Sequence, residues 1–115
     1  MNNFIKYCQE GNLEKAKQIY NTDNNIDIHI NHDYIFRYSC YKCNIDICSW
    51  LYNLDNNIDI HANCDALFRN SCIDGHLEVC QWLYSLSNNI NIHYFNDEAF
   101  RFSCENGHID VCKWL

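Results

Sequence analysis

Positive charge is scarce in this 115-residue sequence. Eight Lys and Arg residues stand against 15 Asp and Glu residues, which gives a formal net charge of −7 at pH 7. Proteins that bind nucleic acid neutralise phosphates with clustered Lys and Arg, so this balance excludes a basic nucleic-acid footprint. Glycine is scarce too, because only Gly11, Gly75 and Gly107 are present, 64 and 32 residues apart. That spacing excludes a glycine-rich phosphate loop.

Long apolar runs are also absent. No run approaches the roughly 20 residues of a membrane-spanning helix, and residues 1–10 lack the apolar stretch of a signal peptide. We therefore expect a soluble, intracellular protein with no membrane partner. Because 48% of the residues are hydrophobic and 15% are aromatic, the chain has enough apolar surface to fold.

The sequence does contain an internal repeat of 32 residues. At this offset Phe4, Phe36, Phe68 and Phe100 fall into register, as do Cys8, Cys40, Cys72 and Cys104. The copies follow without a gap as 1–32, 33–64, 65–96 and an incomplete 97–115. A fixed period of this length is typical of repeat architectures. We predict a single domain over 1–115 that is built from these copies.

The third copy illustrates the predicted content of each repeat. Asp65 is a candidate N-cap, and apolar residues at helical spacing up to Gly75 predict a first helix over about 66–74. Apolar residues about every third position predict a second helix over about 77–87. Ile90 then begins an extended connection of alternating apolar and polar residues. Because neither helix can bury its apolar stripe alone, we predict an all-α solenoid of stacked antiparallel helix pairs with short extended connecting loops.

The motif Gly75-His76-Leu77-Glu78-Val79, its counterpart at 107–111 and the following Trp-Leu pair resemble the second-helix signature of ankyrin repeats. The resemblance covers the whole chain and is closest to the Asn- and Ile-rich ankyrin proteins of giant DNA viruses that infect amoebae. It implies a non-catalytic protein–protein interaction scaffold, located in the cytoplasm of a host cell if the protein is viral.

The chain departs from the ankyrin pattern in its first helix and its loop. The Thr-Pro-Leu-His motif is absent, and Arg37, Arg69 and Arg101 occupy the place of its His. The stretch that corresponds to the family's β-hairpin finger is shorter, so the resemblance does not extend to a binding surface built on long fingers.

The two ends of the repeat array differ in polarity. Copy one has Lys15, Lys17 and Gln18 where copy two has Ile47, Ser49 and Trp50. We interpret the polar set as an N-terminal cap, which solenoids need for solubility. The sequence stops at Leu115 inside the last second helix, where truncation exposes Trp114. We expect either a poorly ordered last half-repeat or a fragment of a longer array, and a monomer or weak association through the uncapped C-terminal end.

The nine Cys residues leave two interpretations open. Cys40 and Cys43 have the Cys-x-x-Cys spacing that chelates zinc or exchanges thiols. Seven Cys residues instead form two ladders, Cys8, Cys40, Cys72 and Cys104 on the first helices and Cys48, Cys80 and Cys112 on the second. Rungs of successive copies about 8–10 Å apart exceed the roughly 7 Å limit for a disulfide. We favour reduced, buried core residues, with a thiol- or metal-binding protein that uses Cys and His as the alternative.

The repeated polar residues give no sign of catalysis. Cys, His and Asp recur in each copy, whereas an enzyme needs one nucleophile and one base, so we predict no enzymatic activity and no cofactor. We expect His29, His61 and His93 to bond loop backbone. Asp33, Asp65 and Asp97 precede the repeated Arg residues by four positions. This spacing predicts helix-supporting ion pairs, with a charged binding stripe as the alternative.

Positions that differ between copies are free to recognise a partner. The candidate partner-binding surface consists of Tyr38, Tyr41, Asn70, Ile73, Tyr94, Phe95 and Phe102. Aromatic residues of this kind are enriched among binding hot spots. We expect an unidentified protein partner. Neutral variation on a solvated face and a passive spacer within a longer array are the alternatives.

Overall fold

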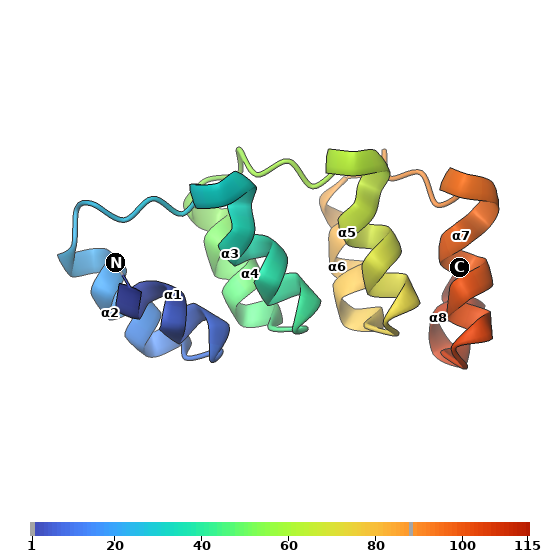
Figure 1. The fold of residues 1–115 in the computed structure, drawn as a ribbon, viewed down its shortest axis with the longest axis horizontal. Coiled ribbons are helices and arrows are strands. Elements are labelled where there is room, and N and C mark those ends of the chain that lie inside the picture. Colours follow the sequence, from blue (N-terminus) through green and yellow to red (C-terminus); the bar gives the residue numbers. More distant parts are fainter. Residues whose placement is uncertain (1, 88) are drawn as a thin grey trace. The chain divides into compact units, whose positions relative to one another are not determined.

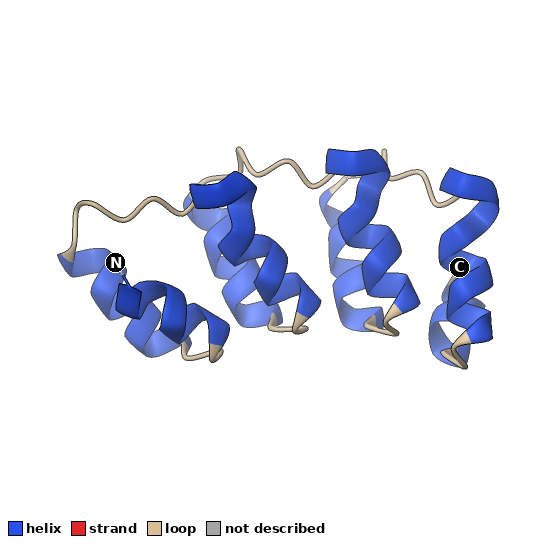
Figure 2. Ribbon diagram, in the orientation of Figure 1, coloured by secondary structure: helices blue, strands red, loops and turns tan. Residues whose placement is uncertain are grey.

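A computed structural model describes residues 2–87 and 89–115, and the regular structure of these residues is helical (Figure 2). The helices are α1 (Asn2–Gln9), α2 (Leu13–Thr22), α3 (Ile30–Tyr41), α4 (Ile45–Leu54), α5 (Ala62–Ile73), α6 (Leu77–Leu86), α7 (Tyr94–Glu105) and α8 (Ile109–Trp114) (Figure 1). The predicted all-α class and the helix-pair content of each repeat are therefore confirmed. The predicted second helix of copy three, 77–87, ends one residue later than α6.

The chain divides into two compact units, Met1–Ile58 and Asp59–Leu115. In the first unit, α1 pairs with α2 and α3 pairs with α4, and α1 packs against α3. In the second unit, α5 pairs with α6 and α7 pairs with α8, and α5 packs against α7. Each unit is thus a stack of two helix pairs in which the first helices face one another.

A tight turn with one left-handed residue closes each helix pair. The left-handed residue is Gly75 in α5–α6, with φ +78°, as the sequence predicts, and Gly11 and Gly107 have φ of +77° and +79°. A Cβ on Gly75 would lie 2.4 Å from His108 Nδ1, so the turn requires glycine for space as well as for φ. Cys43 occupies the same place in the second pair with φ +60°. This confirms that its Cys-x-x-Cys spacing arises at a turn position.

The core of each unit repeats the same residues. Phe4, Phe36 and Phe68 are fully buried, and the connections contribute Ile28, Ile58, Ile60 and Ile90, each at most 6% exposed. In each unit an indole of the second helix pair packs against the first pair: Trp50 lies 6.1 Å from Phe4 between ring centroids, and Trp114 lies 5.9 Å from Phe68. The expectation that Trp114 is simply exposed is therefore wrong, because its ring is half-buried against Phe68 and Tyr84.

The cysteine ladders are only partly buried. Cys8, Cys40, Cys48, Cys72 and Cys80 are fully buried, as predicted. The prediction is wrong for the fourth copy, where Cys104 is exposed and Cys112 is half-buried. Phe100 of the same copy is 45% exposed. Burial at the ladder positions therefore differs between the fourth copy and the second and third copies.

The helices α3, α5 and α7 begin with an unexpected left-handed turn. In α5 the turn comprises Asn63, Cys64 and Asp65, with φ between 55° and 59°, and 31–33 and 95–97 adopt the same conformation. The right-handed part of α5 begins at the following residue, where the sequence predicts the first helix to start. Left-handed backbone costs about 1–2 kcal/mol for each residue that has a Cβ. Three such residues in succession therefore require compensating contacts.

Candidate interaction surface

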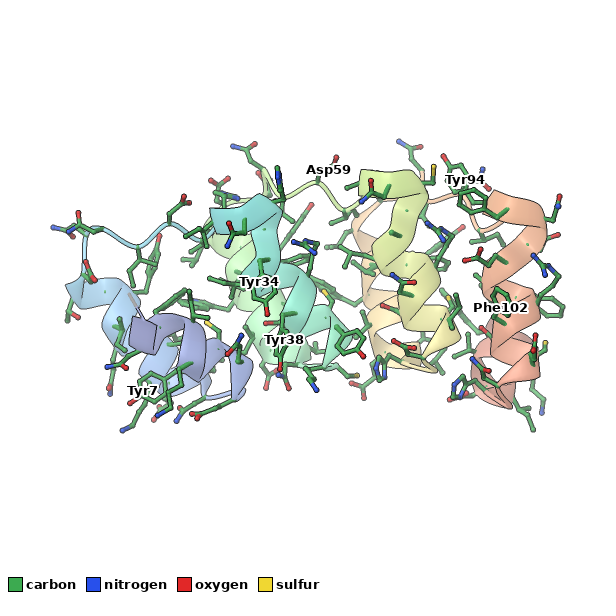
Figure 3. The ribbon with its side chains drawn as sticks, in the orientation of Figure 1. Tyr7, Tyr34, Tyr38, Asp59, Tyr94 and Phe102 are labelled. Atoms are coloured by element: carbon green, nitrogen blue, oxygen red, sulfur yellow. The ribbon has the colours of Figure 1, made fainter. Side chains whose placement is uncertain are left out.

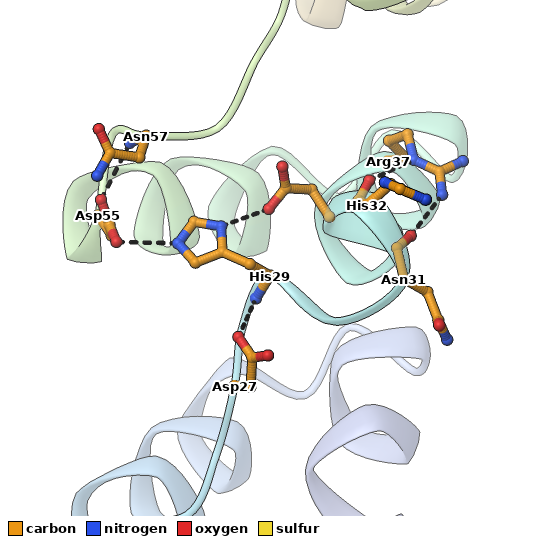
Figure 4. A network of polar contacts seen from close by, with 8 residues as sticks. Asp27, His29, Asn31, His32, Arg37, Asp55 and Asn57 are labelled. Atoms are coloured by element: carbon orange, nitrogen blue, oxygen red, sulfur yellow. Dashed lines mark hydrogen bonds and ion pairs between the residues drawn. The ribbon is translucent and has the colours of Figure 1, made fainter.

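Repeated polar side chains hold the left-handed turns in place (Figure 4). In the first unit, His29 N–H donates to Asp27 Oδ1 at 2.9 Å, and His29 Nδ1 lies 2.5 Å from Asp33 Oδ1. Arg37 donates from Nε to the carbonyl of His32 and from Nη2 to that of Asn31, both at 3.0 Å. The Arg37 bonds tie the turn to the helix that follows, and the His29 contacts tie it to the connection that precedes it. They supply the compensation that the strained backbone needs.

The same contacts recur in the second unit. Arg69 donates from Nε to the carbonyl of Cys64 and from Nη2 to that of Asn63, both at 2.9 Å. The Asp65 carboxylate contacts His61 Nδ1 at 2.5 Å and accepts the Asn91 N–H at 3.1 Å. Asp65 therefore joins the connection to the turn. Its predicted role as an N-cap is replaced by these two contacts.

Two predictions about these polar residues need correction. The Arg residues bind turn carbonyls, and the Asp residues four positions earlier bind His, so the predicted Asp–Arg pairs do not form at this spacing. The physical reason is that the left-handed turn rotates the Asp side chain away from the helix face that carries Arg. The rings of His29, His61 and His93 contact carboxylate or hydroxyl groups, whereas the sequence predicts contacts with loop backbone.

His29 differs from its counterpart because it lies between two carboxylates. Its Nε2 lies 2.9 Å from Asp55 Oδ2, and Asp55 also accepts the Asn57 N–H. The contacts with Asp55 and Asp33 raise the pKa of His29 above 6.5, and His29 in turn lowers the pKa of Asp55. At the corresponding place in the second unit, His61 Nε2 contacts the hydroxyl of Ser87 at 3.1 Å.

The predicted surface residues of the first unit lie on α3. Tyr41 is 59% exposed and Tyr38 is half-buried. Lys42 Nζ lies 5.7 Å from the ring centroids of both. Tyr34, which sequence reasoning did not select, stacks 5.9 Å from Tyr38 and lies beneath the Arg37 guanidinium. Figure 3 shows Tyr34 and Tyr38 pointing to the same side of α3.

The remaining predicted residues lie in the second unit. Asn70 and Phe95 are exposed, and Ile73, Tyr94 and Phe102 are half-buried, so each of them is accessible. The Arg69 guanidinium lies 4.8 Å from the Phe95 ring centroid and pairs with Glu98 at 2.9 Å. Arg101 lies 5.4 Å from the Phe102 ring. Figure 3 places Tyr94 at the start of α7 and Phe102 further along it.

Sequence reasoning missed the partners that hold these rings. Tyr34 corresponds to Ala66 and Glu98 in the later copies. This position varies between copies, as do the positions of the predicted surface residues. That variation is the sequence signal that identifies both Tyr34 and Glu98. Within the described residues no group of three or more His, Cys, Asp or Glu is placed to hold a metal ion.

A known protein family matches residues within the second unit. Residues 65–115 match the family model described as ankyrin repeats (many copies). The match supports an ankyrin-repeat family. Ankyrin repeats are generally protein–protein interaction modules and are typically non-catalytic. The comparison with curated proteins and the comparison with solved structures each found no match. Among the described residues no helix has the length and apolar character needed to cross a membrane.

Proposed function

We propose that the chain is a non-catalytic protein-interaction module that binds a protein partner through the outward side of its first helices. In the first unit this surface comprises Tyr34, Tyr38 and Tyr41. In the second unit it comprises Asn70, Ile73, Tyr94, Phe95 and Phe102. The partner is recognised by shape and side-chain chemistry, with no covalent step.

The observation that carries this proposal is the pairing of accessible aromatic rings with cations. Tyr38 and Tyr41 share Lys42, and Phe95 lies under Arg69. A ring held by a cation has fewer rotamers to lose on binding, which lowers the entropic cost of association. Aromatic and Arg side chains are also the residues most enriched among hot spots. These rings are therefore suited to anchor a partner.

The proposal extends ankyrin character to residues 1–64, which the family match does not reach. The support is the unbroken 32-residue register and the recurrence of the tight turn within each helix pair, in which Gly11 and Cys43 are the left-handed residues. The resemblance to Asn- and Ile-rich viral ankyrin proteins supports a viral origin. With that origin, the proposed location is the cytoplasm of the host cell.

Affinity capture followed by titration calorimetry with the captured, purified partner tests the function. Tyr38→Ala/Tyr41→Ala and Phe95→Ala/Phe102→Ala are each expected to weaken binding about tenfold or more, because hot-spot truncation costs more than about 1.4 kcal/mol. Matched controls are Asp46→Ala/Asn53→Ala on α4 and Glu78→Ala/Gln81→Ala on α6, all at exposed positions, which should bind like the parent chain.

Folding is checked by circular dichroism on every variant, so that lost binding is not confused with lost structure. Undiminished binding by both aromatic variants would refute the proposed surface. Failure to capture any partner under conditions in which a known ankyrin module succeeds would favour the passive spacer and overturn the function itself.

A further inference from the structure

Three cysteine pairs span the two helices of a repeat. Cys48 donates its S–H to Cys40 Sγ at 3.3 Å, and Cys80 to Cys72 Sγ at 3.3 Å. The third pair is closer, since Cys112 donates to Cys104 Sγ at 2.7 Å. The spacing of eight residues therefore places two sulfurs together inside each of these repeats. The first copy has Ala16 at the second position and lacks such a pair.

Burial separates the first two pairs from the third. Cys40, Cys48, Cys72 and Cys80 have no exposed surface. The hydrogen bond with Cys48 and burial raise the pKa of Cys40, and the hydrogen bond with Cys72 and burial raise the pKa of Cys80. Because thiolates are the reactive form of Cys, each of these pairs is shielded from solvent and contains one Cys, Cys40 or Cys80, that is held as a thiol.

The third pair combines access with proximity. Cys104 is exposed and Cys112 is half-buried, so an external reagent can reach Cys104 first. The hydrogen bond to Cys104 raises the pKa of Cys112 to about 11, so Cys112 remains protonated until its partner has reacted. The sulfurs, 2.7 Å apart, need to approach by only about 0.7 Å to reach the ~2.05 Å of a disulfide bond.

We propose that Cys104 and Cys112 form a modification site that small-molecule disulfides oxidise to an intramolecular disulfide, while the two buried pairs stay reduced. The Cys104 thiolate attacks one sulfur of the reagent RSSR, which forms Cys104–S–S–R and releases RS⁻. Cys112 then loses its proton to solvent and attacks Cys104 Sγ, which breaks the mixed disulfide and releases a second RS⁻.

The reaction balances without any further oxidant. Two protein thiols lose two electrons and two protons, and RSSR takes them up to become two RSH. The product ties α7 to α8 across the turn that contains Gly107. The fourth repeat is therefore the one whose helix pairing responds to the thiol–disulfide balance of its surroundings.

The test uses the full chain with Cys43→Gly and Cys64→Ser, so that the pairs and Cys8 are the only thiols left. This protein is incubated with oxidised glutathione, alkylated and digested with trypsin. Residues 102–113 form one tryptic peptide with Cys104 and Cys112 as its only thiols, and 70–101 form another with Cys72 and Cys80. On oxidation, peptide 102–113 should lose two hydrogens and resist alkylation. We expect it to be oxidised at least about tenfold faster than peptide 70–101.

Two single variants test the order of attack. Cys112→Ala, which places the residue of the first copy at this position, should stop at a lasting glutathione adduct on Cys104. In Cys104→Ser, the half-buried Cys112 should acquire a glutathione adduct more slowly than the exposed Cys104 does in Cys112→Ala. A lasting adduct on Cys104 in the protein that retains Cys112, unreacted Cys104, or equal oxidation rates for the two peptides would each overturn the proposal.

Discussion

Arg69 provides a quantitative test of how the left-handed turns are maintained. Its guanidinium binds two turn carbonyls, pairs with Glu98 at 2.9 Å and lies over Phe95. Arg101 makes the same two carbonyl bonds to Phe95 and Asn96 and a longer ring contact, but it is exposed. Replacing each with Ala therefore compares one motif in two environments within the same unit.

The expected losses follow from these contacts. Two charge-assisted bonds to carbonyls near solvent contribute about 1 kcal/mol each. The Glu98 pair, with side chains 13% and 24% exposed, adds about 1 kcal/mol at most, and the ring contact adds about 0.5–1 kcal/mol. Because contacts of one side chain are not additive, we expect Arg69→Ala to cost about 2–3 kcal/mol. Arg101→Ala, which loses fewer contacts in a wetter site, should cost about 1–1.5 kcal/mol.

Urea unfolding followed by circular dichroism measures both costs. Hydrogen exchange of the Asp65 amide, which donates to the His61 carbonyl at 3.1 Å, reports opening of the turn itself. Arg69→Lys is the charge-preserving control, and it should recover less than half of the loss because an ammonium cannot bind both carbonyls as a planar fork does. Equal costs for the two Ala variants, or full rescue by Lys, would refute the reasoning.

Three further predictions concern other parts of the fold. Because contacts with Asp55 and Asp33 raise the pKa of His29, their contribution to stability is complete below pH 6.5 and is lost as the pH rises through the raised value. The urea midpoint of the parent should therefore decrease as the pH rises above 6.5, whereas the midpoint of His29→Gln should change less with pH. Cys43→Gly should stabilise the chain by about 0.5–1 kcal/mol in urea unfolding, because relief of left-handed strain outweighs the added entropy of glycine. Phe68→Ala should cost about 3–5 kcal/mol in the same assay, since the ring is fully buried, and a loss below about 1 kcal/mol would contradict the packing.

The helix pairs could be predicted because their signals are local. Apolar residues at helical spacing define α6 within one residue, and the turn glycines mark where the helices of a pair meet. The fixed 32-residue register strengthens each assignment, because a position that is apolar in several copies is expected to lie in the core. Phe4, Phe36 and Phe68 satisfy this reasoning fully, whereas Phe100 shows its limit: burial depends on a neighbour, and identical residues differ where the neighbour differs.

The polar contacts could not be predicted because they depend on backbone conformation. Pairing Asp33 with Arg37 assumes a right-handed helix between them, and the left-handed turn at 31–33 removes that assumption. No local propensity favours left-handed backbone at residues such as Cys64 or Phe95. His29 also contacts Asp55, which is 26 residues away. This contact depends on how the connection before α3 lies relative to the end of α4 in three dimensions.

The polar residues that repeat also indicate which positions are free to take part in the proposed recognition. His29, Asp33 and Arg37 are committed to the turn in the first unit, and their counterparts do the same in the second. A side chain that satisfies strained backbone cannot change without loss of stability. Variation between copies is therefore confined to positions outside this set of turn-binding residues. One such position is Tyr38 in the second copy, Asn70 in the third and Phe102 in the fourth. Because these side chains differ while the backbone beneath them repeats, each copy presents different chemistry at the same place, which is the property that a modular binding surface requires.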